Sequence, residues 1–131
     1  MYNVKPKIFF CYTTRDNEID LLLLTNLKKN LNLLNLFYTY IDLIDNNKSI
    51  NPQENVIKNL NSSDILCIIN TPNTYKSPWV KKEIYYANKH NIPIIKIELT
   101  SIYNFVNIDD KTQLLYNPFI ITLIQTVLHN K

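Results

Sequence analysis

Residues 7–12 read KIFFCY, a short and uninterrupted apolar run rich in phenylalanine and isoleucine. A strand that is buried on both faces has this appearance, because neither face alternates with polar residues. The polar residues Thr13 to Asp16 follow, and Asp16 is the candidate N-cap of a helix whose apolar positions recur at three- and four-residue steps from Ile19 to Leu34. The chain is therefore predicted to begin with a buried strand and an amphipathic helix.

Strands and helices continue to alternate toward the carboxyl end of the chain. Three more strands are predicted at residues 36–41, 64–70 and 92–99, with helices from Pro52, from Ser77 to about His90, and from Pro118. Residues 42–50 are expected to form a polar loop, and a short edge strand is one interpretation of residues 103–108. Strands that alternate with helices predict right-handed βαβ units. We expect a single α/β domain over residues 1–131, a flavodoxin-like doubly wound parallel sheet of four to five strands with helices on both faces.

Composition excludes several classes of function. The chain has no glycine, so it contains neither a dinucleotide fingerprint, nor a phosphate-binding loop, nor a nucleophile elbow. Its net charge is +3 and its lysines are scattered, which argues against a nucleic-acid partner. No apolar run is long enough to span a membrane and no signal-peptide core is recognisable, so we expect a soluble, cytoplasmic protein. Cys11 and Cys67 lie in apolar runs, which favours reduced thiols, and the two histidines lack partners at zinc-ligand spacing, so no metal site is expected.

In doubly wound sheets, ligands bind outside the carboxyl ends of the strands. Here the segments at that edge are residues 12–16, 42–50 and 70–83. Asp16 is interpreted as a helix cap, and Asp42 with Asp45 is either a carboxylate pair or a set of local backbone acceptors. A phospho-acceptor receiver domain is set aside, because no acidic cluster follows the first strand and no aspartate closes the third.

The helix that starts at Ser77 carries an unusual stripe beside the one expected to face the sheet. Trp79, Glu83, Tyr86 and His90 follow one another at steps of four, three and four residues, so they line one face of the helix. A carboxylate between aromatic rings is partly desolvated, which makes Glu83 a candidate for acid/base or cation-stabilising chemistry. The alternative is a solvated Glu83 paired with Lys76, Lys82 or Lys89.

Four blocks of the chain, in order, resemble the Toll/interleukin-1 receptor (TIR) domain family, in particular its standalone bacterial members of the Thoeris type. The blocks are Ile8 to Thr13 followed by Asp16, Tyr40 to Asp42 with the loop and helix that follow, Ser62 to Ile69, and Ser77-Pro78-Trp79-Val80-Lys81-Lys82-Glu83-Ile84. The last block matches the family signature Ser-x-Trp-x-x-x-Glu-[Leu/Ile] at full spacing. Two departures are that Cys11 stands in place of the usual serine, and that the loop after the second strand, the BB loop, lacks its frequent Pro-Gly turn.

The resemblance implies that the protein is an NAD+ nucleosidase, a glycohydrolase or ADP-ribosyl cyclase, in which Glu83 is the catalytic residue. NAD would be the substrate, with no metal and no further cofactor. The active form would be an oligomer that self-associates through TIR surfaces, and the product would act on a separate effector in antiphage defence. Two alternatives stay open: a non-catalytic TIR interaction module and a nucleoside deoxyribosyltransferase-like enzyme. The implied substrate-binding residues are Tyr12, Thr13, Thr14, Asp16, Asp42, Ile50, Ser77 and Trp79.

Overall fold

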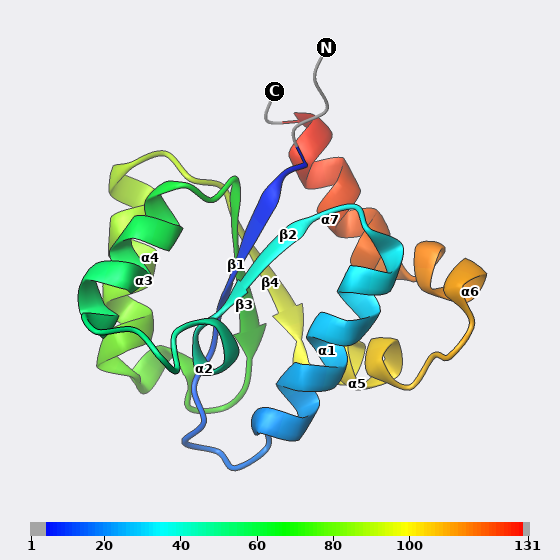
Figure 1. Ribbon diagram of the computed structural model, residues 1–131, viewed down its shortest axis with the longest axis horizontal. Coiled ribbons are helices and arrows are strands. Elements are labelled where there is room, and N and C mark those ends of the chain that lie inside the picture. The colour runs from blue at the N-terminus through cyan, green and yellow to red at the C-terminus, as the bar shows by residue number, and fades with distance from the viewer. Residues whose placement is uncertain (1–4, 130–131) are drawn as a thin grey trace.

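The computed structural model describes residues 5–129 as a three-layer α/β fold (Figure 1). Its strands are β1 (Lys7–Cys11), β2 (Tyr38–Ile41), β3 (Ile65–Asn70) and β4 (Ile94–Glu98). They form one sheet in the order β2-β1-β3-β4, and all three pairings are parallel. The predicted fold class is therefore confirmed, with four strands.

Helices cover both faces of this sheet, as Figure 1 shows. One face packs against α1 (Leu21–Leu34), α5 (Leu99–Val106) and α7 (Pro118–His129), with α6 (Lys111–Leu115) beside them. The other face packs against α3 (Pro52–Asn61) and α4 (Pro78–Lys89). Two shorter pieces, α2 (Asp42–Asp45) and the 3-10 turn η1 (Thr74–Lys76), lie at the carboxyl ends of the strands. None of the helices formed by residues 5–129 is long and apolar enough to cross a membrane.

The alternation of side chains along β1 divides the core into two halves. Ile8 and Phe10 pack with α1, α5 and α7, whereas Phe9 and Cys11 pack with α3 and α4. All four side chains are almost completely buried, as the uninterrupted apolar run predicts. Cys11 and Cys67 are both free and buried, in agreement with the expectation of reduced thiols.

Asparagine takes the backbone conformations that glycine usually provides. Asn17, Asn35 and Asn91 have φ angles of 58°, 54° and 59°, in the left-handed region. Asparagine tolerates this region better than most residues because its short side chain can bond locally. Asn35 ends α1 in this way, with its N–H donating to the carbonyl groups of Leu31 and Asn32. The chain therefore forms tight helix ends without any glycine.

Three local predictions are wrong, each because tertiary contacts compete with the local pattern. The N-cap of α1 is Asp20, which accepts from Leu23 N at 2.9 Å, and not Asp16, which bonds elsewhere. The segment 42–50 is not a simple loop, because its first four residues form α2.

The third wrong prediction is the edge strand at residues 103–108, which lies mostly in helix α5. Leu99, Ile102 and Phe105 are spaced by three residues, and all three are buried against the rest of the core. The side chain of Asn30 in α1 donates to the carbonyl groups of Phe105 at 3.0 Å and Ile108 at 3.3 Å, where the helix ends. These contacts fasten the carboxyl end of the helix to α1 and favour the helix over a strand.

Candidate functional site

A cavity of about 740 Å³ opens at the carboxyl end of β1, between α2, α3 and the start of α4. A drug-sized or nucleotide-sized molecule needs a volume in this range. Seven of the nine residues predicted for the site line it. The lining residues are Phe10, Tyr12, Thr13, Thr14, Arg15, Asp42, Leu43, Asn46, Asn51, Pro52, Gln53, Val56, Ser77, Trp79 and Glu83.

The position of Glu83 follows from the way α4 begins. Ser77 is the N-cap and accepts from Val80 N at 3.4 Å, and Pro78 occupies the first turn, where its missing N–H leaves no bond unmade. Val80 and Ala87 are completely buried against the sheet. This anchoring places Glu83 on the flank of the helix, on the wall of the cavity.

The surroundings of Glu83 disfavour its charge. Burial raises its pKa to about 7, a hydrogen bond with Cys11 opposes the rise, and the negative charge of Asp42 adds to it. Among residues 5–129 the only ion pair joins Lys28 and Asp45, so Glu83 is not paired with Lys76, Lys82 or Lys89. The interpretation of Glu83 as a solvated, lysine-paired side chain is therefore wrong. A carboxylate without a cationic partner can exchange a proton near neutral pH or stabilise a cation brought by a ligand.

Cys11 contacts this carboxylate from the sheet side. Burial and the neighbouring Glu83 raise the pKa of its thiol well above the ordinary range, so it stays protonated. A protonated thiol can donate to a carboxylate, as a serine hydroxyl would. The Cys11 thiol therefore holds the Glu83 carboxylate by a hydrogen bond from β1.

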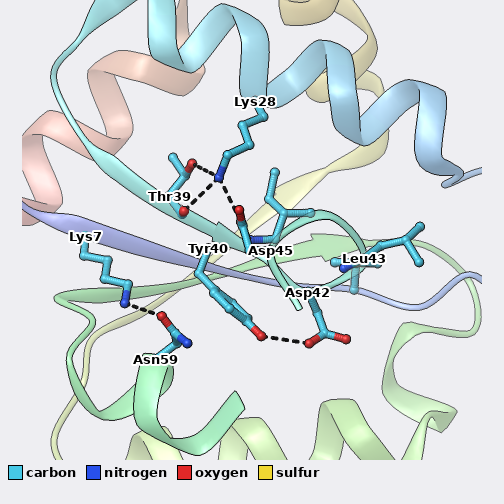
Figure 2. A network of polar contacts seen from close by, with 10 residues as sticks. Lys7, Lys28, Thr39, Tyr40, Asp42, Leu43, Asp45 and Asn59 are labelled. Atoms are coloured by element: carbon cyan, nitrogen blue, oxygen red, sulfur yellow. Dashed lines mark hydrogen bonds and ion pairs between the residues drawn. The ribbon is translucent and has the colours of Figure 1, made fainter. Parts of the chain in front are cut away.

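Asp42 brings a second carboxylate to the cavity. Its Oδ1 accepts from the Tyr40 hydroxyl at 2.9 Å and from Asn46 Nδ2 at 2.8 Å. Figure 2 shows the phenol of Tyr40 pointing from its strand toward Asp42. Burial, together with the bonded carboxylate, raises the pKa of Tyr40, so the phenol remains a donor. One oxygen of Asp42 is therefore held by two donors, while the other makes no hydrogen bond within residues 5–129.

Helix α2 is tied to the sheet at both ends. The hydroxyl of Tyr12 accepts from Leu43 N at 2.9 Å, and Asp45 Oδ2 accepts from Ile41 N at 2.7 Å. Asp45 also pairs with Lys28, which in turn donates to Thr39, as Figure 2 shows. Asp45 thus satisfies local donors, one of the two interpretations offered by the sequence. These bonds hold α2 against the sheet, with Asp42 and Leu43 in the wall of the cavity.

Two predicted site residues do not line the cavity. Asp16 accepts from Asn73 N at 2.9 Å and from the Asn73 side-chain amide, so it joins the loop after β1 to the loop after β3. Hydrogen bonds from Thr71 and Asn73 lower the pKa of Asp16. Ile50 is fully exposed and contributes nothing to the lining.

Other residues of the lining carry no signal in the sequence. Arg15, which is exposed, is the only basic residue in the cavity wall within the described part of the chain, residues 5–129. Asn46 is nearly buried and contacts both Asp42 and Pro52. Both belong to polar stretches that are typical of ordinary loops, so only their position in the fold marks them. Among residues 5–129, no three His, Cys, Asp or Glu side chains gather as a metal site would require.

Trp79 forms a wall of the cavity while half of its surface stays exposed. The ammonium group of Lys82 lies 5.1 Å from the centre of its ring. We expect Trp79→Ala to reduce enzymatic activity about tenfold or more, because it removes a wall of the cavity. The free energy of unfolding is expected to fall by less than about 1 kcal/mol, because the core residues of α4 remain packed. Chemical denaturation and an activity assay on the same preparation would measure both.

The matched control is Tyr85→Ala, which removes an exposed aromatic ring from the same helix, outside the cavity. A destabilisation of about 3 to 5 kcal/mol by Trp79→Ala would instead identify the ring as part of the core.

Comparison with known families identifies a match that covers most of the chain. The family described as "Thoeris protein ThsB, TIR-like domain" matches residues 9–102. This range begins inside β1, contains every residue that lines the cavity, and ends in α5. No curated protein matches the chain.

Proposed function

Because the chain belongs to the family of TIR-like domains of the Thoeris protein ThsB, we propose that it cleaves the bond between nicotinamide and ribose in NAD as part of antiphage defence. The observation that carries the proposal is Glu83, a desolvated carboxylate without a cationic partner on the wall of a nucleotide-sized cavity. Such a group is available to a positively charged ligand or transition state.

The chemistry suits a single carboxylate. As the C1′–N bond breaks, its electron pair moves to nicotinamide, which leaves as a neutral molecule, and the ribose gains oxocarbenium character. Ionised Glu83 stabilises this positive charge at close range. Water that attacks C1′ loses a proton and gives ADP-ribose, whereas attack by a nucleophile of the same molecule gives a cyclic isomer. With a pKa of about 7, Glu83 is partly ionised at neutral pH, and the charge of bound NAD+ favours its ionised form.

The remaining polar groups of the cavity suit the rest of the substrate. The unbonded oxygen of Asp42 can accept from a ribose hydroxyl, since its partner oxygen is already held by Tyr40 and Asn46. Arg15 places a cation on the same wall, and a guanidinium is well suited to a phosphate group. A cation at this position favours a phosphate-bearing substrate over a plain nucleoside, and therefore NAD cleavage over deoxyribosyl transfer.

Incubation of the protein with NAD, and separately with a purine deoxynucleoside and a second base, followed by chromatography of the products, tests the proposal. We expect release of nicotinamide from NAD and no base exchange. Base exchange alone would support a deoxyribosyltransferase-like enzyme. Turnover of neither substrate would favour a non-catalytic TIR interaction module.

We further propose that the active form is an oligomer, and that its product acts on a separate effector. Two apolar side chains of segment 42–50 stay exposed near the cavity, Leu43 by 41% and Ile50 completely, and a second copy could cover them. Specific activity is expected to fall on dilution, while light scattering shows association at the concentrations that are active. Constant specific activity of a protein that scatters only as a monomer would contradict this.

A further inference from the structure

A continuous chain of hydrogen-bonded side chains runs from β1 to the cavity. We call Lys7, Asn59, Asn55, Asn46 and Asp42 the amide chain. Lys7 Nζ donates to Asn59 Oδ1 at 2.7 Å, and Asn59 Nδ2 donates to Asn55 Oδ1 at 3.1 Å. Asn55 Nδ2 donates to Asn46 Oδ1 at 2.8 Å, and Asn46 Nδ2 donates to Asp42 Oδ1 at 2.8 Å. Every link thus connects the nitrogen of one side chain to the oxygen of the next.

The two ends of the amide chain dictate this direction. An ammonium group can only donate and an ionised carboxylate can only accept, so each amide between them must present its oxygen toward Lys7 and its nitrogen toward Asp42. Figure 2 shows both ends, with Lys7 bonded to Asn59 of α3 and Asp42 beside Tyr40. Hydrogen bonds aligned head to tail polarise and strengthen one another.

Further bonds hold the individual links in place. Lys7 Nζ also donates to Ser62 Oγ at 2.9 Å, and Asn59 Nδ2 also donates to the carbonyl of Asn55, one turn earlier in α3. Asn46 uses its second N–H on the carbonyl of Pro52 at 3.0 Å. Its amide group therefore has both donors and one acceptor satisfied in a nearly buried position. An amide bound on three sides cannot turn over without breaking several bonds.

Only the last links of the amide chain reach the cavity. Asp42 and Asn46 line it, whereas Asn55, Asn59 and Lys7 do not. Lys7 has no carboxylate within ion-pair distance among residues 5–129, so its ammonium group is satisfied by Asn59 and Ser62. Lys7 therefore orients the row of amides instead of pairing with an acid. The group on which this orientation acts is the Asp42 carboxylate, at the other end of the amide chain.

We propose that the amide chain positions the Asp42 carboxylate for substrate binding, with Asn46 as the residue that orients it and Asn55 acting through Asn46. The assignment rests on the proposed function in one respect, namely that the unbonded oxygen of Asp42 contacts the substrate. The positioning itself is a property of the protein without substrate, so it can be measured independently.

Asn55→Asp breaks the amide chain with almost no change of shape. The carboxylate introduced at position 55 can still accept from Asn59, but it cannot donate to Asn46 Oδ1. The Asn46 amide then either keeps its oxygen facing the new carboxylate, which repels it, or turns over, which breaks its bond to Pro52 and points its oxygen at Asp42. Asn61→Asp is the matched control, because it makes the same change of charge in α3 at an exposed residue whose Oδ1 only accepts, from the Tyr86 hydroxyl.

Hydrogen exchange of the Asn46 and Ser49 amides is the first readout, since these N–H groups donate to the carbonyls of Asp42 and Asn46. We expect both amides to exchange about tenfold faster in Asn55→Asp than in the wild type or in Asn61→Asp. Equal exchange in the two variants would overturn the proposal, whether or not the protein cleaves NAD. If Asn55→Asp fails to fold, Asn55→Ala removes the same donor without adding charge, and the same comparison with the wild type applies.

NAD kinetics are the second readout. We expect Asn55→Asp to raise KM for NAD about tenfold, because a hydrogen bond between the substrate and the charged Asp42 contributes about this factor to binding. We expect kcat to change by less than about threefold, because Glu83 is untouched. A loss confined to kcat, or a KM equal to that of Asn61→Asp, would overturn the role of Asp42 positioning in binding. If the wild type releases no nicotinamide, the proposed function fails, and the exchange rates alone decide whether the amide chain positions Asp42.

Discussion

Replacing Glu83 with glutamine is expected to lower the rate of nicotinamide release from NAD about 100-fold or more. Glutamine keeps the shape of the side chain and can still accept from the Cys11 thiol, but it has no negative charge. The proposed transition state needs that charge, and the removal of one electrostatic group of this kind typically costs 100- to 1,000-fold in rate, or about 2.7 to 4 kcal/mol.

The measurement is steady-state release of nicotinamide by wild type and variant at equal concentration, with thermal melting of both to confirm folding. Glu18→Gln is the matched control, because Glu18 is exposed and lies outside the cavity lining. If Glu83→Gln and the wild type release nicotinamide at the same rate, Glu83 has no part in the mechanism.

The same substitution is expected to stabilise the protein at high pH. Burial raises the pKa of Glu83 from 4.5 to about 7, so the folded protein holds this proton over a pH range in which the unfolded chain has released it. The folded state therefore binds more protons than the unfolded state, and the free energy of unfolding falls as pH rises from about 4.5 to about 7. Above that range the ionised Glu83 lowers the free energy of unfolding by at most about 3 kcal/mol. Glutamine has no charge to bury and does not lower it in this way.

Urea denaturation of wild type and Glu83→Gln from about pH 4 to about pH 9 measures this difference. The two proteins are expected to have similar stability near pH 4, and the variant is expected to gain steadily until about pH 7 and to keep its advantage above that. A difference in unfolding free energy that does not change with pH would show that Glu83 is solvated. A Glu83→Gln variant that is both more stable and inactive would show that the site is maintained at the expense of stability.

The sequence alone was sufficient for the features that depend on neighbours along the chain. The apolar run in residues 7–12 predicted a doubly buried strand, and the Ser77-Pro78 start predicted α4 and thereby the flank position of Glu83. Helix caps and apolar spacing act within one or two turns, so they can be read from the residues themselves. The order of strands and helices then predicted the edge of the sheet at which Tyr12, Asp42 and Trp79 meet.

Residues 103–108 and Asp16 show where local patterns fail. The aromatic and β-branched residues around Phe105 suit a strand, but burial against α1 and the bonds from Asn30 select a helix. Aspartate is a preferred N-cap residue, yet the carboxylate of Asp16 bonds to Asn73, which lies 57 positions further along the chain. In both cases the competing partner is distant in sequence, so no local propensity contains it.

The chemical state of the site also depends on tertiary structure. The spacing of residues placed Glu83 near a tryptophan, but its raised pKa arises from burial, from Cys11 in β1 and from Asp42 after β2. The amide chain joins β1, α3 and the end of α2, and its asparagines are indistinguishable in the sequence from the many that the chain exposes. Sequence pattern determines which elements form and which face of each is apolar, because those preferences are local. The protonation of a carboxylate and the direction of a hydrogen bond are decided by groups that only folding brings within a few ångströms.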